Sequence, residues 1–304
     1  MNEKPQLSIE ARQIAALVEE HVAMLASTLR PDYLAALEAA LATETSSRGR
    51  EVLGQLVANA HLAKSEGLPL CQDTGYVWVC LEVNGAVQVP ADAFSEVDAA
   101  VARATRTAGM RASLVHDALL DRSNTTNNSP ALTSLLMNKG IPSWLSPAFN
   151  SSPTDASAYL HIMLKGGGSD NASAVAMLPP SAGIAGVSDF VTEAVAAKAA
   201  NACPPLVVGV GVGGSFDSVA SLAKYALLRP LGSAHLVPEI SDLEAELLVR
   251  INSLGIGPGG LGGSTTALGV HINSAGCHIA ALPVAVNVGC TALRSTSLDL
   301  GDFC

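Results

Sequence analysis

Apolar residues recur at helical spacing through the N-terminal part of the chain. The positions on this predicted helix face are Ile9, Ile14, Leu17, Val18, Val22, Leu25 and Leu29. The helix is predicted to end after Arg30, because Pro31 disfavours helical geometry at the residue before it. Two more helices are predicted at 32–43 and 47–65, the second ending before Gly67. Residues 1–66 are therefore predicted to form a helical N-terminal segment.

Strand and helix patterns mix along the rest of the chain. Runs rich in Val and aromatic residues predict strands at 76–83, 159–164 and 206–212. Helical spacing predicts helices at 92–107, 187–202, 216–228 and 239–254. Polar or glycine-dense stretches predict loops at 122–130, 142–155 and 255–263. The predicted fold class is α+β, rich in helix, with small mixed sheets.

Composition and charge exclude several classes of function. The chain has 304 residues, 49% of them hydrophobic, so it can bury a large core. Its net charge of -10 disfavours nucleic acid as a partner, because phosphate binding needs clustered Lys and Arg. Interrupted apolar stretches, a polar start and six scattered cysteines predict no membrane span, secretory signal or disulfide scaffold. We expect a cytoplasmic protein.

Two glycine-rich stretches, 209–214 and 257–262, fit the GxGxxG pattern of dinucleotide-binding loops. The first follows a predicted strand and precedes a predicted helix, as that motif requires. However, the region some twenty residues further on has no strand that ends in Asp or Glu. The second contains Pro258 and follows a helix. Both are better interpreted as tight loops, and a nucleotide-binding Rossmann domain is not predicted.

Cys71, Gln72 and Asp73 place a soft metal ligand, an amide and a carboxylate side by side before a predicted strand. Core packing is the default role of a lone cysteine. Cys71, Cys203 and Cys290 nevertheless all lie close to proline or glycine, where a side chain can leave a loop toward a shared centre. Asp73 has two possible roles: it closes the turn after Cys71, or it exchanges protons.

Four blocks of sequence carry a resemblance to a known family. They are residues 70–75, 165–171, 202–205 and 278–290. These blocks resemble the α subunit, or N-terminal domain, of the iron–sulfur fumarases and of the related tartrate dehydratases. The similarity runs from about Ile14 to about Arg294, nearly the whole chain.

The resemblance implies a cofactor and a set of site residues. It implies a 4Fe-4S cluster with one iron open to substrate. The implied cluster ligands are Cys71, Cys203 and Cys290. The implied acid–base and catalytic residues are Asp73 and His278, and the implied substrate-binding residues are Gln72, Arg111, Lys165 and Gly167. For Arg111 and His278 the alternatives are a solvated surface arginine and a hydrogen-bonded, half-buried histidine.

Some positions depart from the family pattern. Ser264 stands where many members carry a basic residue, so this chain lacks one cation of the family's anion-binding set. Residues 44–47 and 228–233 look more like tartrate dehydratases, whereas 165–171 and 284–287 look more like fumarases. Because the latter blocks lie nearer the chemistry, the main expectation is reversible hydration of fumarate to malate. The alternatives are L-tartrate dehydration to oxaloacetate and a non-catalytic iron–sulfur subunit.

The resemblance also implies a partner. It covers only the α half of single-chain members, so we expect a separate β subunit to supply the base and further cations. The expected substrate is a small dicarboxylate, and the expected assembly is a heterotetramer or a homo-oligomer of α. Residues 1–304 are expected to form one domain, with the cluster carried by residues 67–304.

Overall fold

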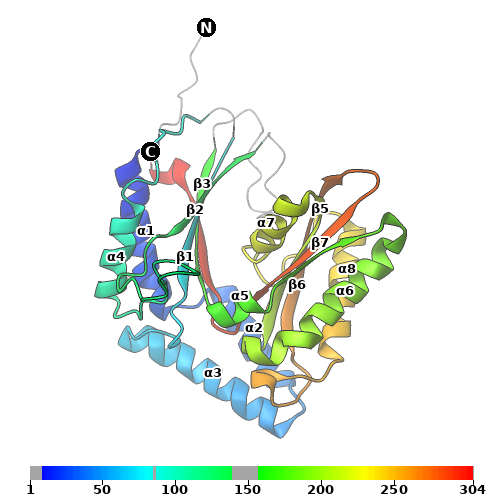
Figure 1. The fold of residues 1–304 in the computed structure, drawn as a ribbon. Helices are drawn as coiled ribbons and strands as arrows, with labels where there is room; N and C mark the ends of the chain where they lie inside the picture. The colour runs from blue at the N-terminus through cyan, green and yellow to red at the C-terminus, as the bar shows by residue number, and fades with distance from the viewer. Residues whose placement is uncertain (1–8, 85–86, 139–156, 304) are drawn as a thin grey trace.

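Two four-stranded sheets, each covered by helices, form the centre of the molecule (Figure 1). The computed structural model describes residues 9–84, 87–138 and 157–303, so the predicted loop at 142–155 lies outside the described residues. Each sheet contains both parallel and antiparallel strand pairs. The predicted α+β class with small mixed sheets is therefore confirmed.

Three helices form the predicted N-terminal segment. They are α1 (Ala11–Ser27), α2 (Pro31–Thr43) and α3 (Ser47–Glu66). Pro31 occupies the first turn of α2, where its missing N–H has no helical partner to lose. Ser46 accepts a hydrogen bond from the Gly49 N–H and so caps α3, and Gly67 ends this helix with a φ of 66°. The predicted helices are confirmed, with ends shifted by a few residues.

The first sheet has the strand order β2-β1-β3-β8. Its strands are β1 (Tyr76–Asn84), β2 (Leu132–Asn138), β3 (Ala158–Lys165) and β8 (Arg294–Asp299). Alternate residues of β1, from Val77 to Val83, belong to the same buried apolar cluster as α1 and α4 (Val97–Thr107). The prediction began α4 at residue 92, but residues 91–96 form turns. Helices α1 and α4 therefore cover one face of this sheet (Figure 1).

The second sheet has the order β4-β7-β5-β6. Its strands are β4 (Ala174–Leu178), β5 (Leu206–Gly214), β6 (Ala267–Cys277) and β7 (Leu282–Gly289). Helix α7 (Phe216–Ala226) packs on one face, and α6 (Gly183–Lys198) and α8 (Pro238–Asn252) pack on the other (Figure 1). The predicted strand at 206–212 is β5, and the predicted helices at 187–202, 216–228 and 239–254 correspond to these three. Strands β2, β4, β6, β7 and β8 were not predicted.

The first GxGxxG stretch is part of β5 itself and has a packing role. A Cβ on Gly209 would overlap the Ala223 carbonyl, and one on Gly211 would overlap the Val219 carbonyl. These glycines therefore allow the backbone of α7 to lie directly on the sheet. This packing accounts for the pattern without a nucleotide.

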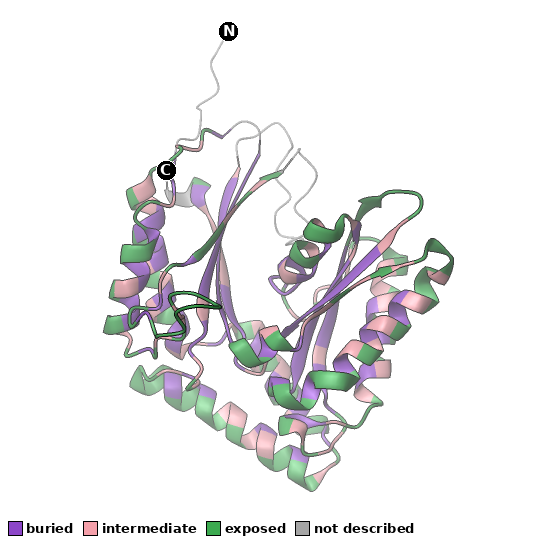
Figure 2. Ribbon diagram, viewed as in Figure 1, coloured by how far each residue is buried: buried purple, intermediate pink, exposed green. Residues whose placement is uncertain are grey.

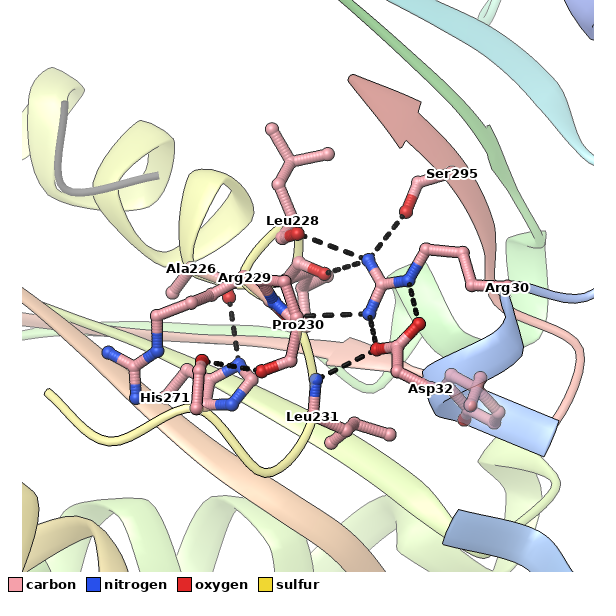
Figure 3. Close-up of polar contacts among 12 residues, drawn as sticks. Arg30, Asp32, Ala226, Leu228, Arg229, Pro230, Leu231, His271 and Ser295 are labelled. Atoms are coloured by element: carbon pink, nitrogen blue, oxygen red, sulfur yellow. Dashed lines mark hydrogen bonds and ion pairs between the residues drawn. The ribbon is translucent and has the colours of Figure 1, made fainter. Parts of the chain in front are cut away.

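Arg30, between α1 and α2, ties the N-terminal segment to the chain after α7 and to the first sheet (Figure 3). Its guanidinium pairs with Asp32 and donates to the carbonyl of Leu228 at 3.1 Å and to the hydroxyl of Ser295 on β8 at 3.0 Å. Asp32 in turn accepts from the Leu231 N–H at 2.8 Å. One charged pair thus holds the helical segment, the chain after α7 and the first sheet together.

Buried residues concentrate on the strands and on the inner faces of the helices, whereas α3 is largely exposed (Figure 2). The main apolar clusters lie under α1 and α4, between the N-terminal helices and the two sheets, and under α6 and α8. None of the helices in the described ranges is long and apolar enough to cross a membrane.

Candidate functional site

Several strand ends meet at one place, and the strand register explains why. Tyr76, the first residue of β1, lies opposite Lys165, the last residue of β3. In the second sheet Val207, near the start of β5, lies opposite Gly289, the last residue of β7. Residues 290–293 then cross from the end of β7 to the start of β8 in the first sheet. The loops that carry the three predicted ligand cysteines are therefore brought together.

The Cys203 loop and the Cys290 loop are joined directly. The backbone N–H of Thr291 donates to the Cys203 carbonyl at 3.0 Å, and the Tyr33 hydroxyl donates to the Cys290 carbonyl at 2.7 Å. Cys203 is exposed and has a φ of 53°, which is uncommon for a residue with a side chain. It follows a 3₁₀ turn (Ala199–Ala202) and precedes Pro204, as a loop ligand would.

The Cys71 loop is fixed from the N-terminal segment. The Leu70 N–H donates to the Ala26 carbonyl at 2.8 Å, and the Asn59 side chain donates to the Leu70 carbonyl at 2.9 Å. Cys71 itself is half-buried. Helices α1 and α3 thus position this cysteine.

Asp73 holds the turn and also links two motifs. Its Oδ1 accepts from the Gly75 N–H at 3.1 Å, which is the turn-closing role that the simpler interpretation predicts. Its Oδ2 accepts from the Gly167 N–H at 2.9 Å, at the start of the short helix α5 (Gly167–Asn171). Two backbone donors therefore orient the carboxylate.

The three thiols lie close enough to affect one another's ionisation. Burial raises the pKa of Cys203, and negative charge on Cys290 and Cys71 raises it further. Burial also raises the pKa of Cys290, against the lowering effects of Arg294 and Lys165. Because metal binding requires thiolates, this arrangement favours a positively charged occupant that offsets their mutual repulsion.

A cavity of about 370 Å³ opens beside the Cys71 loop. Its lining residues are Gln72, Asp73, Gly75, Tyr76, Arg111, Ala112, Ser113, Asn124 and Gly167. Four of these are predicted site residues, and Arg111 is the only cationic side chain in that set. The volume accommodates a small organic acid.

Two residues that the sequence did not single out hold the cavity wall in place. Asn128 is fully buried; it accepts from the Ser113 N–H at 2.9 Å and donates to the Gly75 carbonyl at 2.9 Å. Thr74 donates through its hydroxyl to the Arg111 carbonyl at 2.5 Å. The Arg111 segment is thus fixed to the start of β1. The polar cluster at 122–130, which contains Asn128, predicts a loop. It does not show that this loop is anchored to the Arg111 segment and to Gly75.

Lys165 has all of its amine contacts within the chain. It is fully buried, and its amine donates to Ser169 Oγ at 3.1 Å and to the Val288 carbonyl at 2.6 Å and pairs with Asp170 at 3.4 Å. It is absent from the cavity lining. The structure thus directs the Lys165 amine to the last residues of β7, just before Cys290.

His278 lies apart from the thiols. It is exposed in the turn between β6 and β7, and its Nδ1 accepts from the Ala280 N–H at 3.1 Å. Cys290 follows the other end of β7, and a strand of this length spans roughly 25 Å. Within one chain, His278 is therefore separated from Asp73 and the cysteines.

Ser264 is engaged with Glu44. The backbone N–H and the hydroxyl of Ser264 both donate to this buried carboxylate, at 2.9 Å each. The neighbouring glycine-rich loop supports the Cys203 loop, because the Gly259 N–H donates to the Pro204 carbonyl at 2.8 Å. The second GxGxxG stretch is therefore a support for a ligand loop.

A hydrogen-bonded chain lies behind the cavity. Lys224 on α7 donates to the Tyr76 hydroxyl at 2.9 Å, and that hydroxyl donates to Asp170 at 3.2 Å. Burial and the charge of Asp170 raise the pKa of Tyr76, so its phenol stays protonated. The sequence gave no signal for this series of hydrogen bonds, because its three residues come from three separate elements.

Comparison with known proteins matches residues 15–299 to the family model described as fumarate hydratase. A protein of Methanocaldococcus jannaschii named "Putative L(+)-tartrate dehydratase subunit alpha" is 38% identical over 286 residues, which cover 93% of this chain and 95% of that protein. The L(+)-tartrate dehydratase α subunit of Escherichia coli is 34% identical over 286 residues, covering 94% and 90%. The chain belongs to the iron–sulfur fumarate hydratase and tartrate dehydratase family. This family is one of hydro-lyases, so the expected lyase class is supported.

The similar proteins change the balance between the two expected substrates. The similar proteins of Methanocaldococcus jannaschii and Escherichia coli are both named as α subunits of L(+)-tartrate dehydratase. Fumarate hydration, the main expectation from sequence, is therefore less well supported than the tartrate alternative. Glu44, whose carboxylate accepts from the backbone and the hydroxyl of Ser264, belongs to the block 44–47 that resembles tartrate dehydratases.

The chemistry of the donor set fits the cluster of this iron–sulfur family. Among the described residues, no three His, Cys, Asp or Glu side chains converge on a position for a single metal ion. A 4Fe-4S cluster does not need such convergence, because each thiolate binds a different iron. The guanidinium of Arg294 is buried near Cys290 and Cys71, and its Nη1 has no hydrogen-bond partner. A buried, unpaired cation beside thiols suits an anionic centre.

Proposed function

We propose that this chain is the α subunit of a 4Fe-4S-dependent L-tartrate dehydratase, which removes water from tartrate to give oxaloacetate. The observation that carries the proposal is the convergence of three cysteine loops, distant in sequence, beside a cavity lined by Gln72, Asp73 and Arg111. The names of the similar proteins support tartrate over fumarate as the substrate.

In this proposal Cys71, Cys203 and Cys290 hold the cluster. When bound, the cluster supplies a Lewis acid for the departing hydroxyl, through an iron that no cysteine occupies. Asp73 exchanges the proton of that hydroxyl, because its carboxylate lines the cavity and is held by the N–H groups of Gly75 and Gly167.

Arg111 and Gln72 bind the substrate. The guanidinium of Arg111 is exposed in the cavity lining and can pair with one carboxylate of the dianion through two N–H groups. The amide of Gln72 can both donate to a carboxylate and accept from a hydroxyl. Tartrate differs from malate by one hydroxyl group, so a side chain with both abilities suits it.

A second chain completes the site. A dicarboxylate carries two negative charges, and the cavity lining contributes one cation, Arg111. The reaction also needs a base that removes the proton from the carbon adjacent to the leaving hydroxyl, and Asp73, the one carboxylate in that lining, serves the hydroxyl. We therefore assign the second cation and the carbon base to a β subunit, as the α-subunit names of the similar proteins suggest. The exposed His278 can reach a substrate only across such an interface or an interface between α chains.

The test is a panel of substrates on the complex of α and β chains purified and reconstituted without oxygen. The panel contains L-tartrate, D-tartrate, meso-tartrate, malate, fumarate and mesaconate. We expect cluster-dependent formation of oxaloacetate from L-tartrate to exceed every other reaction. Faster hydration of fumarate would transfer the assignment to fumarase, and a loaded cluster without turnover on any compound would leave a non-catalytic iron–sulfur subunit.

A further inference from the structure

Arg294 links the loops of two predicted cluster ligands. It is the first residue of β8 and follows the crossover that carries Cys290. Its Nε donates to the Ala292 carbonyl at 2.9 Å, two residues after Cys290. Its Nη2 donates to the Asp73 carbonyl at 3.0 Å, two residues after Cys71. The guanidinium therefore sets the spacing of these two loops through backbone contacts on both.

The charge of Arg294 has no carboxylate partner among the described residues. Arg294 is 1% exposed, and no ion pair within residues 9–84, 87–138 and 157–303 involves it. A buried guanidinium without a counter-charge is costly, so an anion is expected within reach. Burial lowers the pKa of Arg294, and the negative charges of Cys290, Cys71 and Asp73 raise it, so two of the three predicted ligand thiols are among the groups that act on this guanidinium.

Lys165 is the other buried cation near Cys290, and its bonding is different. Its amine has three donors, and they serve Ser169, the Val288 carbonyl and Asp170. Arg294 retains Nη1, which is buried and unpaired. Of the two cations, Arg294 is the one with a donor left for a ligand.

We propose that Arg294 is a positioning residue for the cluster: it fixes the Cys71 and Cys290 loops, and its Nη1 donates to a sulfur of the bound 4Fe-4S centre. This inference rests on the proposed function, because it needs the cluster to bind at these cysteines. A cluster with a core charge of 2+ and three thiolates carries one net negative charge. Arg294, which is itself buried from water, offsets that charge.

The proposal has a consequence that turnover does not report. When the cluster takes up one electron from a reductant, its negative charge rises by one. A fixed positive charge and an N–H donor to sulfur both favour the reduced state, so they raise the reduction potential. Loss of Arg294 is therefore expected to make the midpoint potential more negative and to lower the amount of cluster retained.

The experiment compares Arg294→Lys, Arg294→Gln and Arg294→Met with wild type, each as the αβ complex reconstituted without oxygen. Arg30→Met is the matched control, because Arg30 also joins chain segments through carbonyls but has Asp32 as its counter-ion. Iron and sulfide content, unfolding of the metal-free protein, and a dithionite titration followed by electron paramagnetic resonance are measured. We expect the two neutral variants to fold, to retain several-fold less cluster than wild type and to have a more negative potential.

Arg294→Lys keeps the charge and loses the forked contacts, so we expect a potential near that of wild type with reduced loading. Neutral variants that fold and match wild type in loading and potential overturn the proposal, and so do neutral variants that both fail to fold, since Arg294 is then purely structural. A shift of the same size in Arg30→Met overturns it as well. A wild-type complex that takes up no iron or sulfide refutes the proposed function itself, whereas a loaded wild type with unchanged variants refutes only the role of Arg294.

Discussion

Glu44 tests how the N-terminal segment supports the loop beneath Cys203. Its carboxylate is 2% exposed and accepts from the N–H groups of Ser46, Ser264 and Thr265 and from the Ser264 hydroxyl. Burial alone would raise the pKa of Glu44, but these donors outweigh burial and lower it from 4.5 to about 2. The carboxylate is thus held by neutral donors in place of a basic side chain.

We predict that Glu44→Gln lowers the free energy of unfolding at neutral pH by about 3 kcal/mol, because each unit of pKa depression is worth about 1.36 kcal/mol. The amide also turns an N–H group toward donors that need an acceptor, which leaves them unpaired. Because the folded pKa is depressed, the stabilisation is complete above the ordinary pKa of 4.5 and is lost as the pH falls from there toward about 2. The difference between wild type and variant should therefore be constant near neutral pH and shrink below pH 4.5.

The assay is urea unfolding of the reduced, metal-free chain, followed by circular dichroism across this pH range. Glu38→Gln is the control, because Glu38 is half-exposed and pairs with the exposed His61. We expect the control to change the free energy of unfolding by less than about 1 kcal/mol. Equal stability of Glu44→Gln and wild type at pH 7 would refute the reasoning, and so would a loss that persists undiminished at low pH.

Further predictions concern the chemistry. Serine at any one of the three predicted ligand cysteines should abolish iron and sulfide uptake, whereas Cys80→Ser, which alters a buried thiol beside Tyr225, should leave uptake nearly intact; full loading of a ligand mutant would remove that residue from the set. Asp73→Asn should retain the cluster and lower turnover about 10²–10⁴-fold, and a near wild-type rate would leave Asp73 with its turn-closing role alone. Arg111→Lys should raise the KM for the dicarboxylate more than it lowers kcat, because it loses the paired contact; an unchanged KM would argue against this contact. The chain without its β subunit should bind cluster and show negligible turnover, and robust activity of the chain alone would contradict the two-subunit proposal.

The helices of this fold could be predicted from sequence, whereas five of the eight strands in the described residues could not. Helical periodicity and end signals such as Pro31 and Gly67 depend only on residues within or next to one helix, so a local stretch of sequence is enough to predict that helix. Strand β7 contains Pro283, which argues against a strand, and it is held by pairing with β4 and β5 on both sides. Strand β2 exposes Leu132, Leu135 and Met137 and lacks the alternation that marks a half-buried strand. These strands depend on partners far along the chain.

The candidate site shows the same division. The sequence contexts of the cysteines and of Asp73 pointed to a shared centre, and the register of β5 and β7 supplies the reason they meet. Three features depend on which strand ends meet in the fold: the burial of Lys165, the separation of His278 and the contacts of Arg294. No local sequence pattern shows which strand ends meet. The ligand and catalytic roles, and the extent of a single domain, stay predictions.

The spacing of the three cysteines has a consequence for the lifetime of the protein. Roughly 130 and roughly 90 residues separate them, so a bound cluster closes two very long loops of the unfolded chain. Such cross-links reduce the conformational entropy of the unfolded state, and long loops give the largest reduction. Oxidative loss of the cluster would then remove activity and also free those loops, so an inactivated subunit becomes easier to unfold and to degrade. Proteolysis rates of the loaded and the metal-free complex, compared side by side, measure this coupling.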